Sequence, residues 1–170
     1  MSIKYNMDEV LQMAERIEGN AAEFYTKAAD LHSSAPDIDF LRSMARMENE
    51  HRDIFSALRK RLPAAMRQTP DDYPYLKATL YLNEMADVLG GEGTLSQSDP
   101  LTASDSLADL LRRGIGFERQ AILFYIGIRE LVPENRGKKE VDTIVEMEKQ
   151  HMVELVQHLE RVTQARRKKK

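Results

Sequence analysis

The feature of this sequence that most constrains its fold is a pair of short motifs that occurs twice, one hundred residues apart. The motif E-x-x-A-x-x-F-Y begins at Glu18 and again at Glu118, and the motif M-E-x-x-H begins at Met47 and again at Met147. Because the offset is the same for both motifs, the two halves of the chain align without a gap. The pattern predicts that the motifs lie on four helical segments, two in each half.

Four segments of the chain place apolar residues on one face at the helical period of 3.6 residues. Asp37 is expected to cap the second segment, and Pro63 and Pro133 are expected to end the second and third. The helices predicted in this way cover residues 7–31, 37–61, 104–131 and 138–163.

The connections between these helices predict how they are arranged. Short turns at residues 32–36 and 132–137 indicate two antiparallel hairpins, whereas residues 62–103 form a link long enough to run the full length of a bundle. A long crossover between hairpins is typical of the ferritin-like arrangement. The expected fold is therefore all-α, a ferritin-like four-helix bundle in one domain over residues 1–165, with a basic tail at 166–170.

The long link contains a further predicted helix, residues 75–89, followed by a loop rich in glycine and serine at residues 90–98. This extra helix is expected either to cover the bundle or to make a contact between two copies of the chain. The basic tail is interpreted as a solvated helix end or as a docking patch for an acidic partner.

Composition excludes several classes of function. The 170 residues are 42% hydrophobic and 31% charged, which suits a soluble domain of amphipathic helices. No apolar run approaches the roughly 18 residues that span a bilayer, and the first residues do not resemble a secretory signal, so a cytoplasmic location is expected. The absence of cysteine excludes disulfides, thiolate catalysis and iron–sulfur clusters, and the net charge of −3 argues against nucleic acid as a partner.

The four glutamates of the two motifs interrupt apolar stripes that must face the core. Burying unpaired carboxylates is very costly, so such groups take up protons or bind cations. Two divalent metal ions would balance four carboxylates, and two neutral imidazoles would complete the ligand set. Since residues three apart share a helix face, each E-x-x-H motif can serve one metal and share its carboxylate with the second. The predicted metal ligands are Glu18, Glu48, His51, Glu118, Glu148 and His151.

Tyr25 and Tyr125 lie two turns beyond the first glutamate of each half. A buried phenol needs a partner, so each tyrosine is expected to hold a ligand carboxylate in place, with plain core packing as the alternative. His158 has no such context and is expected at the surface. The remaining acidic residues near the motifs are assigned to solvated faces: Glu15, Glu23, Glu50 and Glu154.

At these motifs, and in the stretch from Ile115 to Pro133, the sequence resembles the rubrerythrin group of the ferritin-like superfamily. The resemblance implies a dinuclear iron centre in which Glu48 and Glu148 bridge the two ions and Glu18 and Glu118 are terminal ligands. It also implies that Tyr25 donates a hydrogen bond to Glu118, and that Tyr125 donates one to Glu18.

The sequence departs from the rubrerythrin pattern in two respects. Typical members carry a rubredoxin-like domain with four cysteines, and this chain has no cysteine. They also place a seventh glutamate at the position that Ala121 occupies here. An electron donor would therefore have to be a separate protein, and efficient peroxidase turnover is put in doubt.

The leading functional hypothesis is a diiron oxidoreductase that reduces hydrogen peroxide, or dioxygen, with electrons from an external donor protein. A second hypothesis is a ferroxidase that handles iron for storage or delivery. A third is a non-redox bundle that binds zinc or manganese, because these ligands do not by themselves select the metal. The expected assembly is a homodimer or a higher homo-oligomer, without nucleic acid or a membrane.

Overall fold

The computed structural model describes residues 6–31, 35–64, 67–68, 101–102, 104–129 and 138–167. The described chain is all-helical, and the predicted four-helix bundle is confirmed. Its helices are α1 (Met7–Leu31), α2 (Ala35–Lys60), α4 (Leu107–Arg129) and α5 (Lys138–Arg167). None of these helices is both long enough and apolar enough to cross a membrane. The predicted helix at 75–89, the loop at 90–98 and the turn at 132–137 lie outside the described residues.

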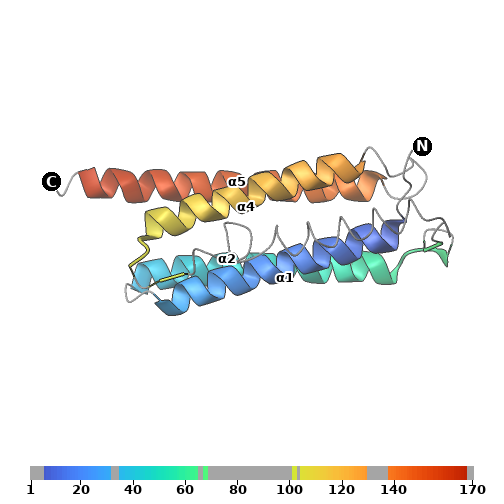
Figure 1. Cartoon of the computed structure of the whole chain (residues 1–170), viewed down its shortest axis with the longest axis horizontal. Coiled ribbons are helices and arrows are strands. Elements are labelled where there is room, and N and C mark those ends of the chain that lie inside the picture. The colour runs from blue at the N-terminus through green and yellow to red at the C-terminus, as the bar shows by residue number, and fades with distance from the viewer. Residues whose placement is uncertain are drawn as a thin grey trace.

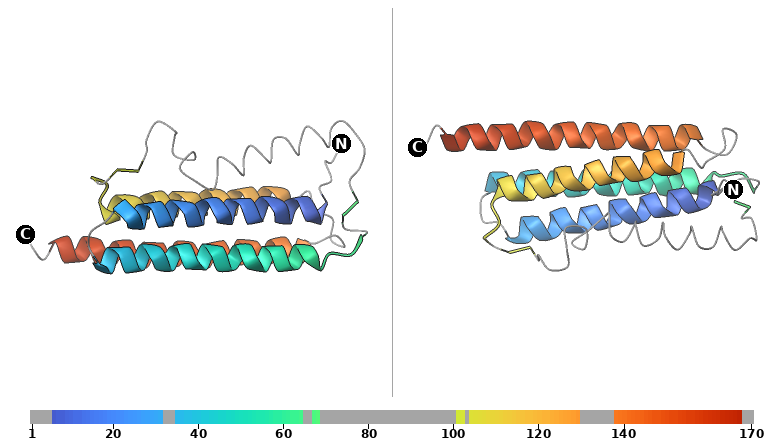
Figure 2. Two further views of the ribbon diagram at one scale, coloured as in Figure 1. Left: turned by 90° about the horizontal axis from the view of Figure 1, so that it is seen from below. Right: turned by 45° about the horizontal axis from the view of Figure 1, so that its top comes forward.

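The helices form two antiparallel pairs, α1 with α2 and α4 with α5 (Figure 1). The pairs face each other in a fixed register, which ring contacts across the bundle define. Phe24 of α1 meets Phe117 of α4 with ring centroids 4.7 Å apart, and His51 of α2 stacks on His151 of α5 at 4.2 Å. Figure 2 shows the resulting two layers, with α1 beside α4 and α2 beside α5.

The end of α2 and the beginning of α4 lie at opposite ends of the bundle (Figure 1). The predicted crossover at residues 62–103 connects these two ends, and most of it lies outside the described residues. The glutamates and histidines of the repeated motifs lie at the same height in both hairpins. This arrangement sets the position of the centre described below.

Helix starts are fixed by side chains that satisfy free backbone N–H groups. The backbone N–H of Glu9 donates to Asn6 Oδ1 at 3.0 Å, which caps α1. Ser106 and Asp109 form a reciprocal capping box at the start of α4. The predicted start near residue 104 was therefore too early, because the residues before Ser106 form a separate turn. The predicted cap at Asp37 was also wrong: α2 begins at Ala35, and Asp37 lies in its first turn.

The apolar core is divided into two clusters, one toward each end of the bundle. One cluster includes Leu11, Phe55 and Tyr125, and the other includes Phe24 and Leu110. On every helix, the predicted metal ligands lie between the residues of the two clusters. The bundle therefore has a polar layer at mid-height that is sealed above and below by apolar side chains.

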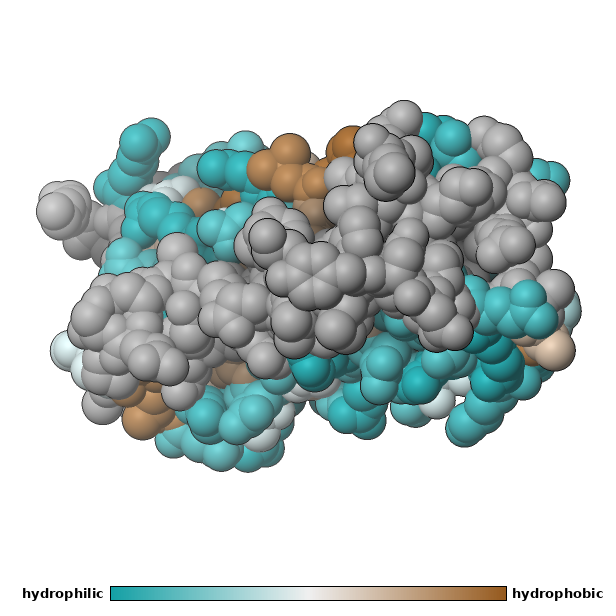
Figure 3. Space-filling view, turned by 45° about the vertical axis from the view of Figure 1, so that its right-hand side comes forward, coloured by the Kyte–Doolittle hydropathy of each residue, from teal (hydrophilic) through white to brown (hydrophobic). Residues whose placement is uncertain are grey.

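On the face shown in Figure 3, the described residues are mainly hydrophilic, with a few groups of apolar side chains. At one end of the first hairpin, Arg59 of α2 joins Asp8 at 3.1 Å and Glu15 at 3.5 Å, both on α1. The assignment of Glu15 to a solvated face was therefore wrong. Its half-buried carboxylate takes part in the ion pairs that tie α1 to α2.

Candidate metal centre

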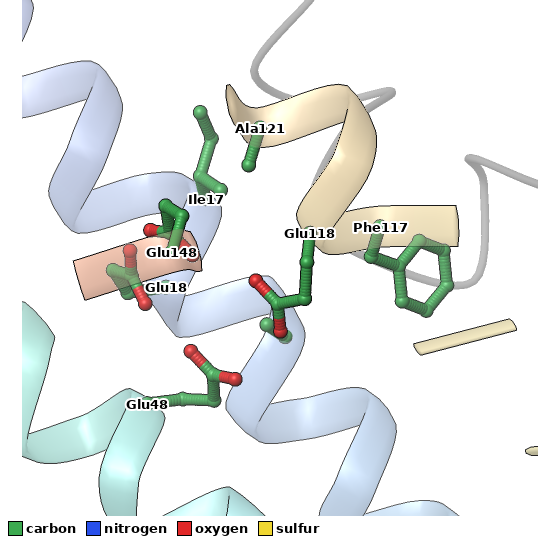
Figure 4. Close-up of a pocket in the computed structure, with 8 residues that line it drawn as sticks. Ile17, Glu18, Glu48, Phe117, Glu118, Ala121 and Glu148 are labelled. Atoms are coloured by element: carbon green, nitrogen blue, oxygen red, sulfur yellow. The ribbon is translucent and has the colours of Figure 1, made fainter. Parts of the chain in front are cut away.

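The mid-height layer is built from one glutamate on each of the four helices. Glu18, Glu48, Glu118 and Glu148 are at most 3% exposed, and their carboxylates turn toward a common point (Figure 4). Each interrupts the apolar stripe of its helix, so packing that stripe into the core also buries the carboxylate. The prediction that the motif glutamates lie together in the interior is confirmed.

The two histidines enter the layer from α2 and α5. Their rings stack nearly parallel, with an angle of 11° between the planes. His51 Nδ1 lies 3.9 Å from a carboxylate oxygen of Glu18, and His151 Nδ1 lies 3.7 Å from Glu118 and 3.3 Å from Glu48. Each histidine therefore meets the first-motif glutamate of its own half. His151 is 3% exposed and the His51 side chain is 14% exposed, so the second half is the better sealed.

Three groups of side chains could each hold a metal ion, because their donor atoms lie within 4.8 Å of one another. The first combines Glu18, His51 and Glu148, and the second combines Glu118, His151 and Glu148. Glu148 belongs to both, as expected for a carboxylate that two ions share. The third group places Glu48 with both histidines. All six predicted ligands thus belong to at least one group that could hold a metal ion.

Several potential metal-binding atoms of this layer make no hydrogen bond within the protein. Buried polar atoms are normally hydrogen-bonded, and an unsatisfied one is costly. In the described part of the chain, five ligand atoms are buried without a hydrogen-bond partner: Oε1 of Glu18, Glu48 and Glu148, and Nδ1 of His51 and His151. Oxygen and imidazole nitrogen are the donors that divalent metals accept, so the residues present fit a pair of such ions.

Burial and the closeness of the carboxylates to one another raise the pKa values of Glu18, Glu118 and Glu148. Desolvation, together with the charges of Glu148 and Glu48, raises the pKa of Glu18 well above its usual value. Burial and the neighbouring Glu118 raise the pKa of Glu148 to about 8, and burial and Glu48 raise the pKa of Glu118. A metal-free centre therefore retains protons that a bound cation would displace.

The two histidines respond to this environment in opposite ways. Burial and the neighbouring His151 lower the pKa of His51 to about 4, so its imidazole is neutral at pH 7. Burial also disfavours the charged form of His151, but contacts with Glu118 and Glu48 outweigh that effect and raise its pKa to about 11. The centre is consequently not symmetric in its metal-free form, although the ligand types are identical in the two halves.

A small pocket with a cavity volume of about 10 Å³, room for about one water molecule, lies among the carboxylates, on the side formed by α1 and α4 (Figure 4). Besides the four glutamates, its walls are apolar: Ile17 and Ala21 from α1, and Phe117 and Ala121 from α4. These residues occupy equivalent positions in the two halves. The prediction from sequence overlooked Ile17 and Phe117, although both immediately precede a ligand glutamate and are apolar in each half.

Tyr25 and Tyr125 are fully buried next to the centre. Burial and nearby carboxylates raise the pKa of both phenols well above the ordinary value, so both remain neutral. The carboxylate that acts most strongly on Tyr25 is Glu118, and the one that acts most strongly on Tyr125 is Glu18. The expected hydrogen bonds between these pairs are not formed, because neither hydroxyl has a hydrogen-bond partner among the described residues. Each tyrosine nevertheless lies near the glutamate of the other half that the resemblance implied, Glu118 for Tyr25 and Glu18 for Tyr125.

Residues outside the centre differ partly from expectation. His158 was expected at the surface, but it is half-buried and stacks on Phe40 with ring centroids 3.5 Å apart. Glu23 and Glu50 are exposed, as expected. Glu154 is half-buried and accepts a hydrogen bond from Gln150 at 3.1 Å.

Comparisons of the chain with protein-family models, curated proteins and solved structures found no match.

Proposed function

We propose that this protein is a diiron-carboxylate oxidoreductase of the ferritin-like kind, which reduces hydrogen peroxide, or dioxygen, with electrons from an external donor. The observation that carries the proposal is the buried layer of four carboxylates and two imidazoles, one glutamate from each helix, with donor atoms left unsatisfied by the protein. Glu18 with His51, and Glu118 with His151, would each hold one ion, and Glu48 and Glu148 would be shared.

The charge of the layer supports a pair of divalent ions. Four carboxylates carry four negative charges when ionised, and two divalent ions neutralise them while the imidazoles remain neutral ligands. A donor set of oxygen and nitrogen without sulfur suits iron, and it also accepts manganese or zinc. Two ferrous ions bound there would supply two electrons, the number that converts one hydrogen peroxide and two protons into two molecules of water.

The pocket supports a small oxidant as the substrate. Its walls beside the carboxylates are Ile17, Ala21, Phe117 and Ala121, which offer neither charge nor hydrogen bonds. Such walls exclude large polar metabolites and admit a small neutral molecule. The two alanines keep the space next to the carboxylates open, since a longer side chain at either position would fill it.

The two tyrosines lie close to the proposed ligands. Their buried phenols are neutral and lie near Glu118 and Glu18, without a hydrogen bond to them. Neutral hydroxyls in these positions add no charge to the centre. The dry surroundings of the layer also keep bulk water away from the reaction.

The proposal is tested by stopped-flow oxidation of protein loaded anaerobically with ferrous iron and mixed with peroxide or dioxygen at equal concentrations. Faster oxidation by peroxide, with two irons oxidised per equivalent, is the expected result. Faster oxidation by dioxygen that continues as more iron is added would instead identify a ferroxidase. Protein that binds metal but is oxidised by neither would be a non-redox metal protein.

A matched control separates the centre from adventitious surface iron. Glu50 lies on α2, two residues from Glu48, and its side chain is exposed. The variant Glu50→Ala should be oxidised like the unchanged protein, whereas Glu48→Ala should lose the fast phase. Equal behaviour of the two variants would place the reacting iron elsewhere.

A further inference from the structure

Gly114 lies in the middle of α4 and faces Tyr25 across the bundle. A Cβ atom built at this position would be less than 3.0 Å from the hydroxyl oxygen of Tyr25, a separation that real Cβ atoms essentially never show. It would also lie 3.3 Å from Cζ of the same ring and 3.4 Å from Cδ1 of Leu155. The end of the tyrosine ring therefore occupies the space that any other residue at position 114 would need.

Among the glycines whose surroundings the structure describes, only Gly114 has this requirement. Glycine is unfavourable in a helix interior relative to alanine, so its presence there calls for a local reason. Gly116, two residues further along α4, would meet nothing within 4 Å if it carried a Cβ atom, and Gly19 of α1 would meet only Arg52 Cδ at 3.8 Å. The contact with Tyr25 supplies the reason at Gly114.

The slot at Gly114 lies one helical turn before Glu118. Side chains on an α-helix lean toward its N-terminus, so the Glu118 side chain extends over the turn that contains Gly114. The Tyr25 hydroxyl is thereby placed on the same turn as the carboxylate, and Glu118 is the carboxylate that affects it most. Phe24 contacts the Tyr25 ring edge to face at 5.1 Å, which limits sideways movement of the ring.

The other half of the molecule does not contain this slot. Position 14, which is equivalent to Gly114, is an alanine and is fully buried. Its Cβ atom fills the volume that glycine leaves open on α4. The two halves are therefore inequivalent at this point, with glycine on α4 and alanine on α1.

We propose that Gly114 is a positioning residue of the centre: its missing side chain forms a slot that receives the Tyr25 hydroxyl beside the turn of α4 over which Glu118 extends, and so makes the Glu118–His151 metal position differ from the Glu18–His51 position. This inference rests on the proposed metal centre, but its steric part concerns the metal-free protein alone. In the metal-free protein the Tyr25 hydroxyl has no hydrogen-bond partner among the described residues. The slot therefore fixes where this hydroxyl lies relative to Glu118.

The steric part is tested by thermal unfolding of metal-free protein. Gly114→Ala should unfold at least about 5 °C below Gly116→Ala, because only the first substitution inserts an atom into an occupied space. In the Tyr25→Phe background, which lacks the hydroxyl oxygen, the same comparison should show a difference of less than about 2 °C. Equal unfolding temperatures for Gly114→Ala and Gly116→Ala in the unchanged background would overturn the slot.

The positioning role is tested by titrating the same variants with cobalt(II), whose visible spectrum reports the ligand geometry. Gly114→Ala should weaken one of the two cobalt sites about tenfold and alter its spectrum, and Gly116→Ala should change neither. In the Tyr25→Phe background, Gly114→Ala should cause no further weakening. Two unchanged cobalt sites in Gly114→Ala would overturn the positioning role even if the slot is confirmed.

The two tests separate this inference from the proposed function. Failure of the unchanged protein to bind cobalt would count against the metal centre, and with it against positioning of a metal ligand. The unfolding comparison would still decide whether the slot exists. A normal cobalt centre combined with equal unfolding temperatures would overturn the slot and leave the metal centre standing.

Discussion

The two hairpins present the same ligands to the middle of the bundle but surround them differently. His151 is 3% exposed, whereas the side chain of its counterpart His51 is 14% exposed, and their pKa values shift in opposite directions. Gly114 meets the end of the Tyr25 ring, and the equivalent position of the first half is Ala14. The residues of the repeated motifs are the same in both halves, whereas the residues around them differ.

The outer faces of the two hairpins also differ in the residues that they expose. Leu123 and Ile126 on α4 are 63% and 43% exposed, and the equivalent positions on α1 are the exposed polar residues Glu23 and Thr26. These side chains are remote from the centre, so they can differ between halves without affecting its ligands. The two halves are thus most alike in sequence at the residues through which all four helices contribute to one site.

The largest expected effects come from ligand substitutions made in matched pairs across the two halves. Glu148→Ala should weaken binding of both ions, because this carboxylate belongs to two ligand groups, whereas Glu18→Ala and Glu118→Ala should each remove one ion. The loss should be at least about 100-fold in affinity at the affected position. Metal content after gel filtration, measured by atomic emission, checks the stoichiometry. Two ions retained in all three variants would refute the ligand assignment.

A second prediction concerns the charge of the layer in metal-free protein. Glu148 has a pKa of about 8 in the folded protein, against an ordinary value of 4.5, so between pH 6.5 and 8 it keeps a proton that the unfolded chain has lost. His151, with a pKa of about 11, also keeps its proton in this window. A raised pKa stabilises the fold at low pH, and this stability is lost as the pH rises. His51, with its pKa of about 4, is neutral throughout the window.

The free energy of unfolding of metal-free protein should therefore fall by about 2 kcal/mol from pH 6.5 to pH 8 for each extra proton held. Urea titrations with a chelator present measure this. With zinc added, the dependence should reverse, because metal displaces the protons and binds more tightly as the pH rises. A metal-free protein that gains stability over this range would contradict the protonated layer.

A third prediction compares the two alanines that face the pocket. Ala121→Leu and Ala21→Leu should each fill space beside the carboxylates and slow oxidation of the iron-loaded protein about tenfold, while two ions remain bound. Stopped-flow rates together with iron content separate blocked access from lost metal. Unchanged rates in both variants would show that the oxidant does not use this pocket.

The smallest expected effect concerns the ion pairs that Arg59 makes in the first hairpin. Arg59 joins Asp8 and Glu15, and the equivalent residue of the second hairpin is Leu159, which packs against the core. Arg59→Met should cost about 1 kcal/mol in urea unfolding, and less at high salt, because these charges are only partly buried. The exposed pair of Arg112 with Asp109 provides a control, and Arg112→Met should cost less.

The buried layer of glutamates and histidines could be predicted from sequence because its signal is local and physical. A glutamate inside an apolar helical stripe must be buried, and a buried carboxylate needs a cation or a proton. Each half contains two such helices, one with the glutamate of the E-x-x-A motif and one with the E-x-x-H motif. Packing all four helices in one bundle places these residues in a single layer. The bounds of α1, residues 7–31, were predicted for a similar reason: its stripe is regular from end to end.

The features that sequence did not predict depend on the register between helices. The slot at Gly114 exists only because Tyr25 lies opposite it, and the stacking of His158 on Phe40 requires α2 and α5 to meet at that height. The cap at Ser106 depends on which of several polar residues in the preceding turn begins the helix. None of these pairings leaves a periodic signal in the sequence.

The central claim, that two metal ions share the carboxylates of Glu48 and Glu148, is tested most directly by Mössbauer spectroscopy. Protein loaded anaerobically with iron-57 and then oxidised with peroxide should contain two irons per chain in a magnetically coupled ferric pair. Such coupling requires ligands common to both ions. Isolated, uncoupled ferric ions, or fewer than two irons per chain, would contradict a shared dinuclear centre.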